Sequence, residues 1–271
     1  MAAAQTLSAQ EAIVSNQIHP TAVISPQAEL GTGNRIGPFV VIEDDVVLGN
    51  DNRIDAHSVI KDGARIGDAN RFHEHVVYAG IPQDLGFKDA ATYARLGSHN
   101  VLREFVTVHR ATTKENGVTA IGDHNYFMAT AHIAHDCQLG NHVIMANDAV
   151  LAGHVHIEDR VFVSGGVKIH QWAHIGEYAM IGGNSKITQD CLPYMITDGH
   201  PGRVRGLNLV GLKRAGFKLD ELRALKHAFR VLLGARGSLE EQLVELEGMD
   251  SPRVQHLLKF IRASKRGFHR S

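Results

Sequence analysis

An apolar residue recurs at every sixth position over most of this 271-residue chain. One series runs from Ile18 to Val108, and a second, in a new phase, runs from Ile121 to Ile187. Neither an α-helix nor a β-strand has a period of six residues. A fixed hexapeptide period is typical of a solenoid, and it predicts a parallel β-helix in which each repeated apolar side chain points into the core.

Three hexapeptides complete one triangular turn of such a helix. Residues 18 positions apart should therefore lie about 4.8 Å apart on neighbouring turns. Glycine follows the repeated apolar residue at several places, as in Ile36-Gly37 and Leu139-Gly140. Because glycine lacks Cβ, we expect tight corners at these positions.

The repeat is interrupted twice before it stops. Residues 80–95 keep its phase but lose its residue types, and residues 111–120 break its phase. Both should project as loops, and loops on a rigid scaffold are common sites of function, although each could equally be a tolerated insertion. We predict an N-terminal segment at 1–17, an all-β parallel β-helix at 18–193 and a C-terminal α-helical domain at 194–271.

The C-terminal part carries helical signals. Apolar residues recur at helical spacing over 219–232, and Gly234 ends that run. Ser238 with Glu241 forms a capping box for a second helix, and Pro252 suits the first turn of a third. A bundle this small should pack on the β-helix rather than stand alone.

Composition excludes several classes of partner. Lys and Arg total 28 against 29 Asp and Glu, so no global field favours nucleic acid or an anionic membrane. The first 17 residues lack the pattern of a secretory signal, and no apolar run could span a bilayer. Cys137 and Cys191 lie 54 positions, or three turns, apart, which exceeds disulfide reach. We therefore predict a soluble cytoplasmic protein with free thiols.

The densest polar cluster lies in the second series of repeats. His135 and Gly153 are 18 positions apart, so they should occupy equivalent points on neighbouring turns. The backbone N–H of Gly153 could then lie within a few ångströms of a group attacked near His135, which would place a base beside an oxyanion donor. The cluster consists of His132, His135, Asp136, Gly153, His154, His170 and Gln171.

Different interpretations of these residues stay open. Histidines on a β-helix corner can simply satisfy local hydrogen bonds, which is the preferred interpretation for His124, His142, His156 and His174. Three histidines could instead hold zinc between subunits. Cys137 could carry an acyl group, although a buried, inert thiol is the preferred interpretation.

Short motifs stand in a fixed order along the chain: Gln83-Asp84-Leu85, Arg103-Glu104, His109-Arg110, 132–137, 151–155, His170-Gln171 and 208–214. This ordered set resembles the family of acyl carrier protein-dependent UDP-N-acetylglucosamine O-acyltransferases, which begin lipid A synthesis. The resemblance covers nearly the whole chain from Ile18. It implies a left-handed coil and a homotrimer with sites between subunits, and we predict neither a metal nor a cofactor.

The resemblance also implies a role for each residue of the site. His135 would be the general base that takes the proton from the sugar 3-hydroxyl as that hydroxyl attacks the thioester of an acyl carrier protein. Asp136 would orient His135, which requires a corner here because adjacent residues in a straight strand face opposite ways. The N–H of Gly153 would stabilise the oxyanion. The residues implied to bind substrate are Gln83, Asp84, His132, His154, His170 and Gln171 around the sugar and reacting groups, and Asn208 and Arg214 at the nucleotide.

Further positions bear on the substrates. Gly183 matches the position that limits acyl length in the family, and its lack of a side chain predicts a long 3-hydroxyacyl chain. Gly86, Val210 and Ala215 depart from the family pattern at positions that serve the nucleotide sugar. A related UDP-sugar, including one with an amine at carbon 3, could therefore be the acceptor instead. The same scaffold could also belong to a γ-carbonic anhydrase-like zinc enzyme or to a catalytically silent protein.

Basic residues are concentrated between Arg203 and Arg236. Acyl carrier proteins are acidic, so this patch predicts a docking surface for the donor, unless it is an ordinary solvated helix face. The patch comprises Arg203, Arg205, Lys213, Arg214, Lys218, Arg223, Lys226, Arg230 and Arg236, against Asp220 and Glu221.

Overall fold

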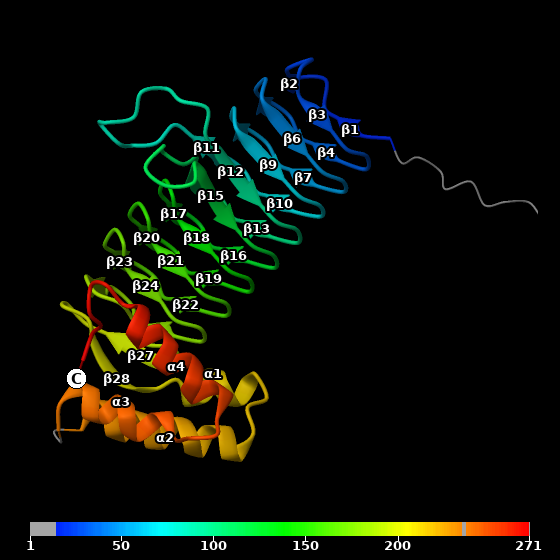
Figure 1. Ribbon diagram of the computed structural model, residues 1–271. Coiled ribbons are helices and arrows are strands. Elements are labelled where there is room, and N and C mark those ends of the chain that lie inside the picture. The colour runs from blue at the N-terminus through cyan, green and yellow to red at the C-terminus, as the bar shows by residue number, and fades with distance from the viewer. Residues whose placement is uncertain (1–14, 235–236, 271) are drawn as a thin grey trace, which may run out of the picture.

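The computed structural model describes residues 15–234 and 237–270. Over these residues the chain forms a left-handed parallel β-helix followed by a group of helices at its C-terminal end (Figure 1). The fold class predicted from the repeat is confirmed. Most of the expected N-terminal segment, 1–17, lies outside the described residues.

Each turn of the β-helix contributes one short strand to each of three sheets, here called A, B and C. Within the described residues these sheets contain eleven, nine and eight strands. Sheet A consists of β1 (Gln17–Ile18), β4 (Arg35–Ile36), β7 (Arg53–Ile54), β10 (Arg71–Phe72), β13 (Val101–Leu102), β16 (Tyr126–Phe127), β19 (Ile144–Met145), β22 (Phe162–Val163), β25 (Met180–Ile181), β27 (Met195–Asp198) and β28 (Arg203–Leu207). Sheet B consists of β2 (Val23–Ile24), β5 (Val41–Ile42), β8 (Val59–Ile60), β11 (Val77–Gly80), β14 (Thr107–His109), β17 (His132–Ile133), β20 (Val150–Leu151), β23 (Lys168–Ile169) and β26 (Lys186–Ile187). Sheet C consists of β3 (Glu29–Leu30), β6 (Val46–Leu48), β9 (Ala64–Ile66), β12 (Tyr93–Leu96), β15 (Val118–Ile121), β18 (Gln138–Leu139), β21 (His156–Ile157) and β24 (His174–Ile175).

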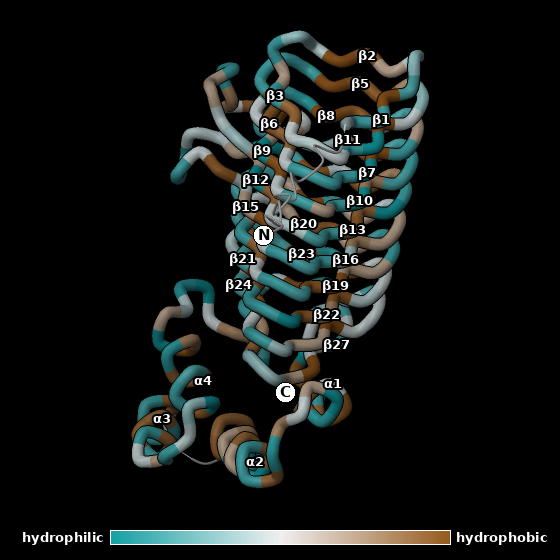
Figure 2. The backbone as a smooth tube through the Cα atoms, turned by 90° about the vertical axis from the view of Figure 1, so that its right-hand side faces the viewer, coloured by the Kyte–Doolittle hydropathy of each residue, from teal (hydrophilic) through white to brown (hydrophobic). Residues whose placement is uncertain are grey.

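The register of the sheets follows the sequence period. Ile133 of β17 lies opposite Leu151 of β20, which in turn lies opposite Ile169 of β23. Each of these side chains is almost fully buried, and apolar positions recur on successive turns (Figure 2). Burying one such side chain per hexapeptide contributes about 1.5–3 kcal/mol of hydrophobic stabilisation, so the repeat itself drives the coil.

The chain turns at three edges, named here A/B, B/C and C/A after the sheets that each edge joins. Residues 81–92 connect β11 to β12, and residues 110–117 connect β14 to β15, so both interruptions of the repeat leave the B/C edge. They project from the side of the β-helix (Figure 1). Their bounds lie close to those of the predicted interruptions, 80–95 and 111–120.

The corners differ in detail from the expectation. The residue with left-handed backbone dihedrals stands three positions after the inward apolar residue and is usually not glycine, as at Phe39 (φ 57°) and Asp136 (φ 61°). The glycine directly after the apolar residue serves close approach instead. At Gly31 a Cβ would lie only 2.6 Å from the carbonyl oxygen of Gly49 on the next turn.

A column of buried asparagines supports the C/A edge. The Oδ1 atom of Asn52 accepts a hydrogen bond from the backbone N–H of Asn70 at 2.9 Å, and Oδ1 of Asn70 accepts from the N–H of Asn100 at 2.8 Å. Buried amides need partners, and each turn here supplies the partner for the next. The column consists of Asn34, Asn52, Asn70, Asn100 and Asn125.

The helical part begins later than predicted. The expected start at residue 194 is wrong for the helices, because β27 extends sheet A beside β25 and pairs with β28 as an antiparallel hairpin. The helices are α1 (Leu209–Arg214), α2 (Leu219–Leu233), α3 (Leu239–Glu247) and α4 (Pro252–Ala263). They share a second apolar core with the last turn of the β-helix, and no helix within the described residues is long and apolar enough to span a bilayer. The division into domains stays a prediction.

A polar network joins α4 to the β-helix. His256 Nε2 lies 3.1 Å from Glu158, whose other oxygen lies 3.2 Å from His174 Nε2. The hydrogen bond to Glu158 raises the pKa of His256, although burial opposes this. Burial alone would raise the pKa of Glu158, but the hydrogen bonds from His174 and His256 prevail and lower it to about 2.

These two shifts predict a pH window for the stability of the interface. The raised pKa of His256 contributes stability that is complete below its ordinary 6.5 and is lost as the pH rises through the raised value. The lowered pKa of Glu158 contributes stability that is present above its ordinary 4.5 and is lost as the pH falls through about 2. His256→Gln should therefore lower the unfolding temperature most between pH 4.5 and 6.5.

Scanning calorimetry of the wild type and the variant across this range measures the effect. His227→Gln is the control, because His227 sits half exposed beside Glu245 on the surface of the helices. A loss at His256→Gln that stays constant well above the raised pKa would contradict the assignment.

Candidate active site

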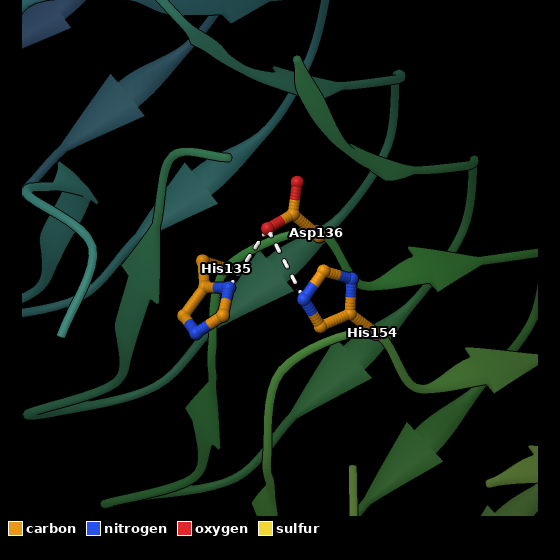
Figure 3. A group of neighbouring side chains, drawn as sticks. All are labelled: His135, Asp136 and His154. Atoms are coloured by element: carbon orange, nitrogen blue, oxygen red, sulfur yellow. Dashed lines mark hydrogen bonds and ion pairs between the residues drawn. The ribbon is translucent and has the colours of Figure 1, made fainter. Parts of the chain in front are cut away.

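His135 and Asp136 form a hydrogen-bonded pair on the B/C edge, directly after β17. The left-handed backbone of Asp136 (φ 61°) turns the chain there, so the two adjacent side chains reach the same side. The Nδ1 atom of His135 lies 2.8 Å from Oδ2 of Asp136 (Figure 3). The corner that the predicted pair requires is present.

Asp136 is fully buried and held by the loop at 110–117. Its carboxylate accepts a hydrogen bond from the backbone N–H of Thr112 at 3.1 Å and one from Thr112 Oγ1 at 2.7 Å. Its own N–H donates to Thr119 Oγ1 at 2.8 Å. Burial alone would raise the pKa of Asp136, but the hydrogen bonds from His135 and Thr112 prevail and hold that pKa below its usual range.

The ionised carboxylate selects the tautomer of His135. A carboxylate can only accept, so the proton of the neutral imidazole must sit on Nδ1, where it faces Asp136. Nε2 is then the basic nitrogen. The His135 side chain is 11% exposed, which leaves this nitrogen accessible.

Gly153 lies directly against the His135 ring. A Cβ at this position would stand 2.4 Å from Cε1 of His135 and 2.8 Å from Nε2, so only glycine leaves room for the imidazole. The register that pairs β17 with β20 brings the two residues together, as predicted from their spacing. Among the described residues, the N–H of Gly153 has no hydrogen-bond acceptor, and it is free to donate to a ligand.

His154 closes the buried side of the pair. Its Nε2 lies 3.7 Å from Asp136 Oδ2, and its ring stands nearly perpendicular to that of His135 (Figure 3). Its other face stacks on Trp172, with ring centroids 3.8 Å apart, and its Nδ1 lies 3.6 Å from Glu115. These contacts fix the ring of His154 beside the dyad.

Further predicted residues line the same edge. His132 points outward from β17, with Nδ1 2.7 Å from Thr107 Oγ1, and burial followed by the nearby His135 lowers its pKa. His170 and Gln171 are exposed one turn beyond Gly153.

The loop at 81–92 supplies the remaining two residues on this edge. Asp84 pairs with Lys114 of the neighbouring loop at 2.5 Å, and that hydrogen bond is the main reason why the pKa of Asp84 is lowered. Gln83 is exposed beside it. The pairing of Asp84 with Lys114 links the two loops to each other.

Three predicted residues lie on different parts of the chain. Asn208 caps α1 by accepting from the N–H of Gly211, and its amide donates to the carbonyl of Tyr178 on the C/A edge. Arg214 is exposed at the end of α1. Gly183 lies on the A/B edge, where a Cβ would meet only a carbonyl oxygen at 3.6 Å. Within one chain these residues do not reach His135.

Several residues of the site were not predicted from the sequence. Thr112, Lys114, Glu115 and Thr119 all come from the interruption at 111–120. The departure of this segment from the repeat, on the edge that carries His135, was the one signal that pointed to them. His109 was named only within the motif His109-Arg110, and no role was predicted for it. Burial, followed by the charges of His132 and His135, lowers its pKa to about 4, which keeps this imidazole neutral.

This geometry bears on two alternatives, a nucleophilic thiol at Cys137 and a bound metal ion. Cys137 is a free, buried thiol that donates to the carbonyl of Ala152, and burial raises its pKa to about 12. It is therefore not a nucleophile at neutral pH. His135, Asp136 and His154 bring possible metal-binding atoms within 4.8 Å of one another. A metal held by all three side chains would compete with the hydrogen bond between His135 and Asp136.

Comparisons with known proteins show what this chain is similar to over its length. The family model described as UDP N-acetylglucosamine O-acyltransferase, domain 2, matches residues 190–269. An acyl carrier protein-dependent UDP-N-acetylglucosamine O-acyltransferase from Burkholderia mallei is 49% identical over 261 residues, which cover 94% of this chain and 100% of that protein. One from Gloeothece citriformis is 46% identical over 184 residues, which cover 68% of this chain and 66% of that protein.

A solved structure supports the same relationship. The UDP-N-acetylglucosamine acyltransferase of Francisella novicida superposes with a TM-score of 0.92 at 32% identity, covering 94% of each chain. Sequence and structure thus agree over nearly the full length, helices included. The chain belongs to the acyl carrier protein-dependent UDP-N-acetylglucosamine O-acyltransferase family.

Proposed function

We propose that this chain transfers a 3-hydroxyacyl group from acyl carrier protein to the 3-hydroxyl of UDP-N-acetylglucosamine, the first step of lipid A biosynthesis, in the cytoplasm. The observation that carries the proposal is the His135–Asp136 pair packed against Gly153 on the B/C edge. Family membership supplies the two substrates. The pair supplies the general base that an acyl transfer to a hydroxyl requires.

The geometry supports a direct transfer. Nε2 of His135 takes the proton of the sugar hydroxyl while the hydroxyl oxygen attacks the thioester carbonyl, and the N–H of Gly153 receives the oxyanion. When the intermediate collapses, the carbon–sulfur bond breaks and the proton on Nε2 passes to the leaving thiolate. The ionised Asp136 stabilises the imidazolium in between. Neutral His109 and weakly basic His132 add no opposing charge beside it.

We also propose a homotrimer with sites between subunits. A column of outward-facing, half-buried apolar residues runs along sheet A, and such a surface is typical of a protein contact. Asn208 lies beside the C/A edge and Gly183 on the A/B edge, whereas His135 lies on the B/C edge. Only a neighbouring copy could bring all three to one substrate. The column consists of Val101, Tyr126, Ile144, Phe162 and Met180.

Gly183 supports a long acyl chain in this proposal, because it has no side chain and only one carbonyl oxygen, at 3.6 Å, lies near the place of a Cβ. The acceptor could also be a related UDP-amino sugar, since Val210, in the helix that follows the cap residue Asn208, departs from the family pattern and is 63% exposed.

The function is tested with purified protein, a series of 3-hydroxyacyl carrier proteins and a panel of UDP-sugars, with products identified by mass spectrometry. We expect O-acylation of UDP-N-acetylglucosamine, fastest with the longer donors. His135→Ala should lower kcat about a thousandfold because the general base is lost, while His142→Ala, an exposed histidine on the C/A edge, should not.

Three outcomes would contradict parts of the proposal. A His135→Ala variant with undiminished kcat would contradict the mechanism. Acylation of a sugar amine alone would show that the acceptor is a UDP-amino sugar and not UDP-N-acetylglucosamine. Faster transfer from a ten-carbon donor than from the longer donors would contradict the proposed role of Gly183.

The basic patch is the proposed docking surface for the carrier protein. Arg223, Lys226 and Arg230 lie exposed on α2, and none of them forms a salt bridge within the described residues. Arg236 of the same patch lies outside the described residues. Cations on one helix that have no carboxylate partner would steer an acidic protein toward the chain.

Charge reversal tests this surface. Replacing Arg223, Lys226 and Arg230 together by Glu should raise KM for the carrier protein about tenfold or more, leave kcat unchanged and weaken the dependence of KM on salt. Lys259→Glu, on the exposed face of α4, is the control. An unchanged KM in the triple variant would exclude docking at α2.

A further inference from the structure

Thr112 donates more hydrogen bonds to the carboxylate of Asp136 than His135 does. Thr112, which is 2% exposed, places both its backbone N–H and its hydroxyl on the carboxylate of Asp136. Its Oγ1 lies 2.7 Å from Oδ2, which is also the oxygen that lies 2.8 Å from His135 Nδ1. One carboxylate oxygen therefore joins the threonine to the imidazole.

The position of Thr112 follows from the loop at 110–117, not from the repeat. The preceding Ala111 is fully buried, and its N–H donates to the carbonyl of Tyr93 on the neighbouring turn, which fixes the start of the loop. Thr119 holds the opposite side by accepting the N–H of Asp136. Asp136 thus lies between Thr112 of this loop and Thr119 of β15.

We propose that Thr112 is a positioning residue for the transfer: its hydroxyl holds the Asp136 carboxylate in the orientation and ionised state that keep His135 a base at Nε2. This inference rests on the proposed function. Thr112 touches neither substrate nor the reacting atoms, so its effect on the reaction passes through Asp136 and His135.

The hydroxyl of Thr112 acts on the negative charge of Asp136 Oδ2. A hydrogen bond donated to an ionised carboxylate stabilises the ionised form, and removing one donor from a buried carboxylate makes that carboxylate more basic. The titratable groups that face Asp136 are His135 and His154, with Glu115 behind His154. None of these groups would take the place of the Thr112 hydroxyl, which donates to Asp136 Oδ2 at 2.7 Å. Without the hydroxyl, the pKa values of the coupled pair should rise, and the carboxylate should lose its fixed orientation.

The experiment compares three variants of the full-length protein. Thr112→Val keeps the shape and the backbone N–H but removes the hydroxyl, and Thr112→Ser restores the hydroxyl. Thr113→Val is the matched control, because Thr113 is exposed in the same loop and its hydroxyl forms no hydrogen bond with any described residue. Rates of acyl transfer are measured across pH, with KM and kcat determined separately for both substrates.

We expect Thr112→Val to lower kcat about tenfold, to leave both KM values unchanged and to move the acid limb of the kcat profile to higher pH. Thr112→Ser should recover most of kcat and the original limb, and Thr113→Val should match the wild type. A Thr112→Val enzyme with the kcat and profile of the wild type would overturn the inference. So would equal losses in the Val and Ser variants, because these would indicate packing and not the hydroxyl.

A second measurement separates this inference from the proposed function. Carbon-13 NMR of the aspartate carboxyls, with Asp136→Asn to identify the resonance, reports the pKa of Asp136 without any substrate. It should be higher in Thr112→Val than in the wild type and Thr112→Ser. If the wild type transfers no acyl group, the proposed function fails, and an unchanged Asp136 titration in Thr112→Val would still refute the role of Thr112.

Discussion

Each turn of the coil stacks in register on its neighbours, and this stacking fixes where the core residues and the site residues lie. Parallel pairing between β17 and β20 sets Ile133 opposite Leu151, and two residues further along the same edge it sets His135 against Gly153. The apolar residues that fill the core also fix this register, since a shift by one residue would turn buried side chains outward. The position of the base is therefore a consequence of core packing.

Because Asp136 is buried and ionised, its hydrogen bond determines which nitrogen of His135 carries the proton. A carboxylate with no exposed surface is stable only when donors satisfy it, and here they come from the imidazole and from a loop that departs from the repeat. The regular coil supplies rigidity, and the interruption at 110–117 supplies the groups that the six-residue pattern has no place for. Both interruptions leave the edge that carries His135, and the pair of Asp84 with Lys114 joins them there.

The period of the sequence predicted the coil, and the spacing of His135 and Gly153 predicted their contact, because both depend on local regularity alone. The hairpin of β27 and β28 was not predicted, since residues 195–207 lack the hexapeptide pattern and pair through the end of sheet A. The role of Thr112 depends on a non-local approach across 24 positions that no motif records. Asn208 and Gly183 lie on other edges of this chain than His135, so the proposed sharing of a site between chains depends on contacts that no pattern within one chain specifies.

We propose that the imidazole of His135 can act as a base only because Gly153 leaves room for it and offers a free backbone N–H beside it. Acyl transfer by Gly153→Ala, compared with Gly206→Ala, tests it most directly, because a Cβ at Gly153 would collide with the imidazole, whereas one at Gly206 would meet nothing within 4 Å. We expect a folded Gly153→Ala protein whose kcat is about a hundredfold lower, and a Gly206→Ala protein with unchanged kcat. A Gly153→Ala enzyme that transfers acyl groups at the wild-type rate would contradict it.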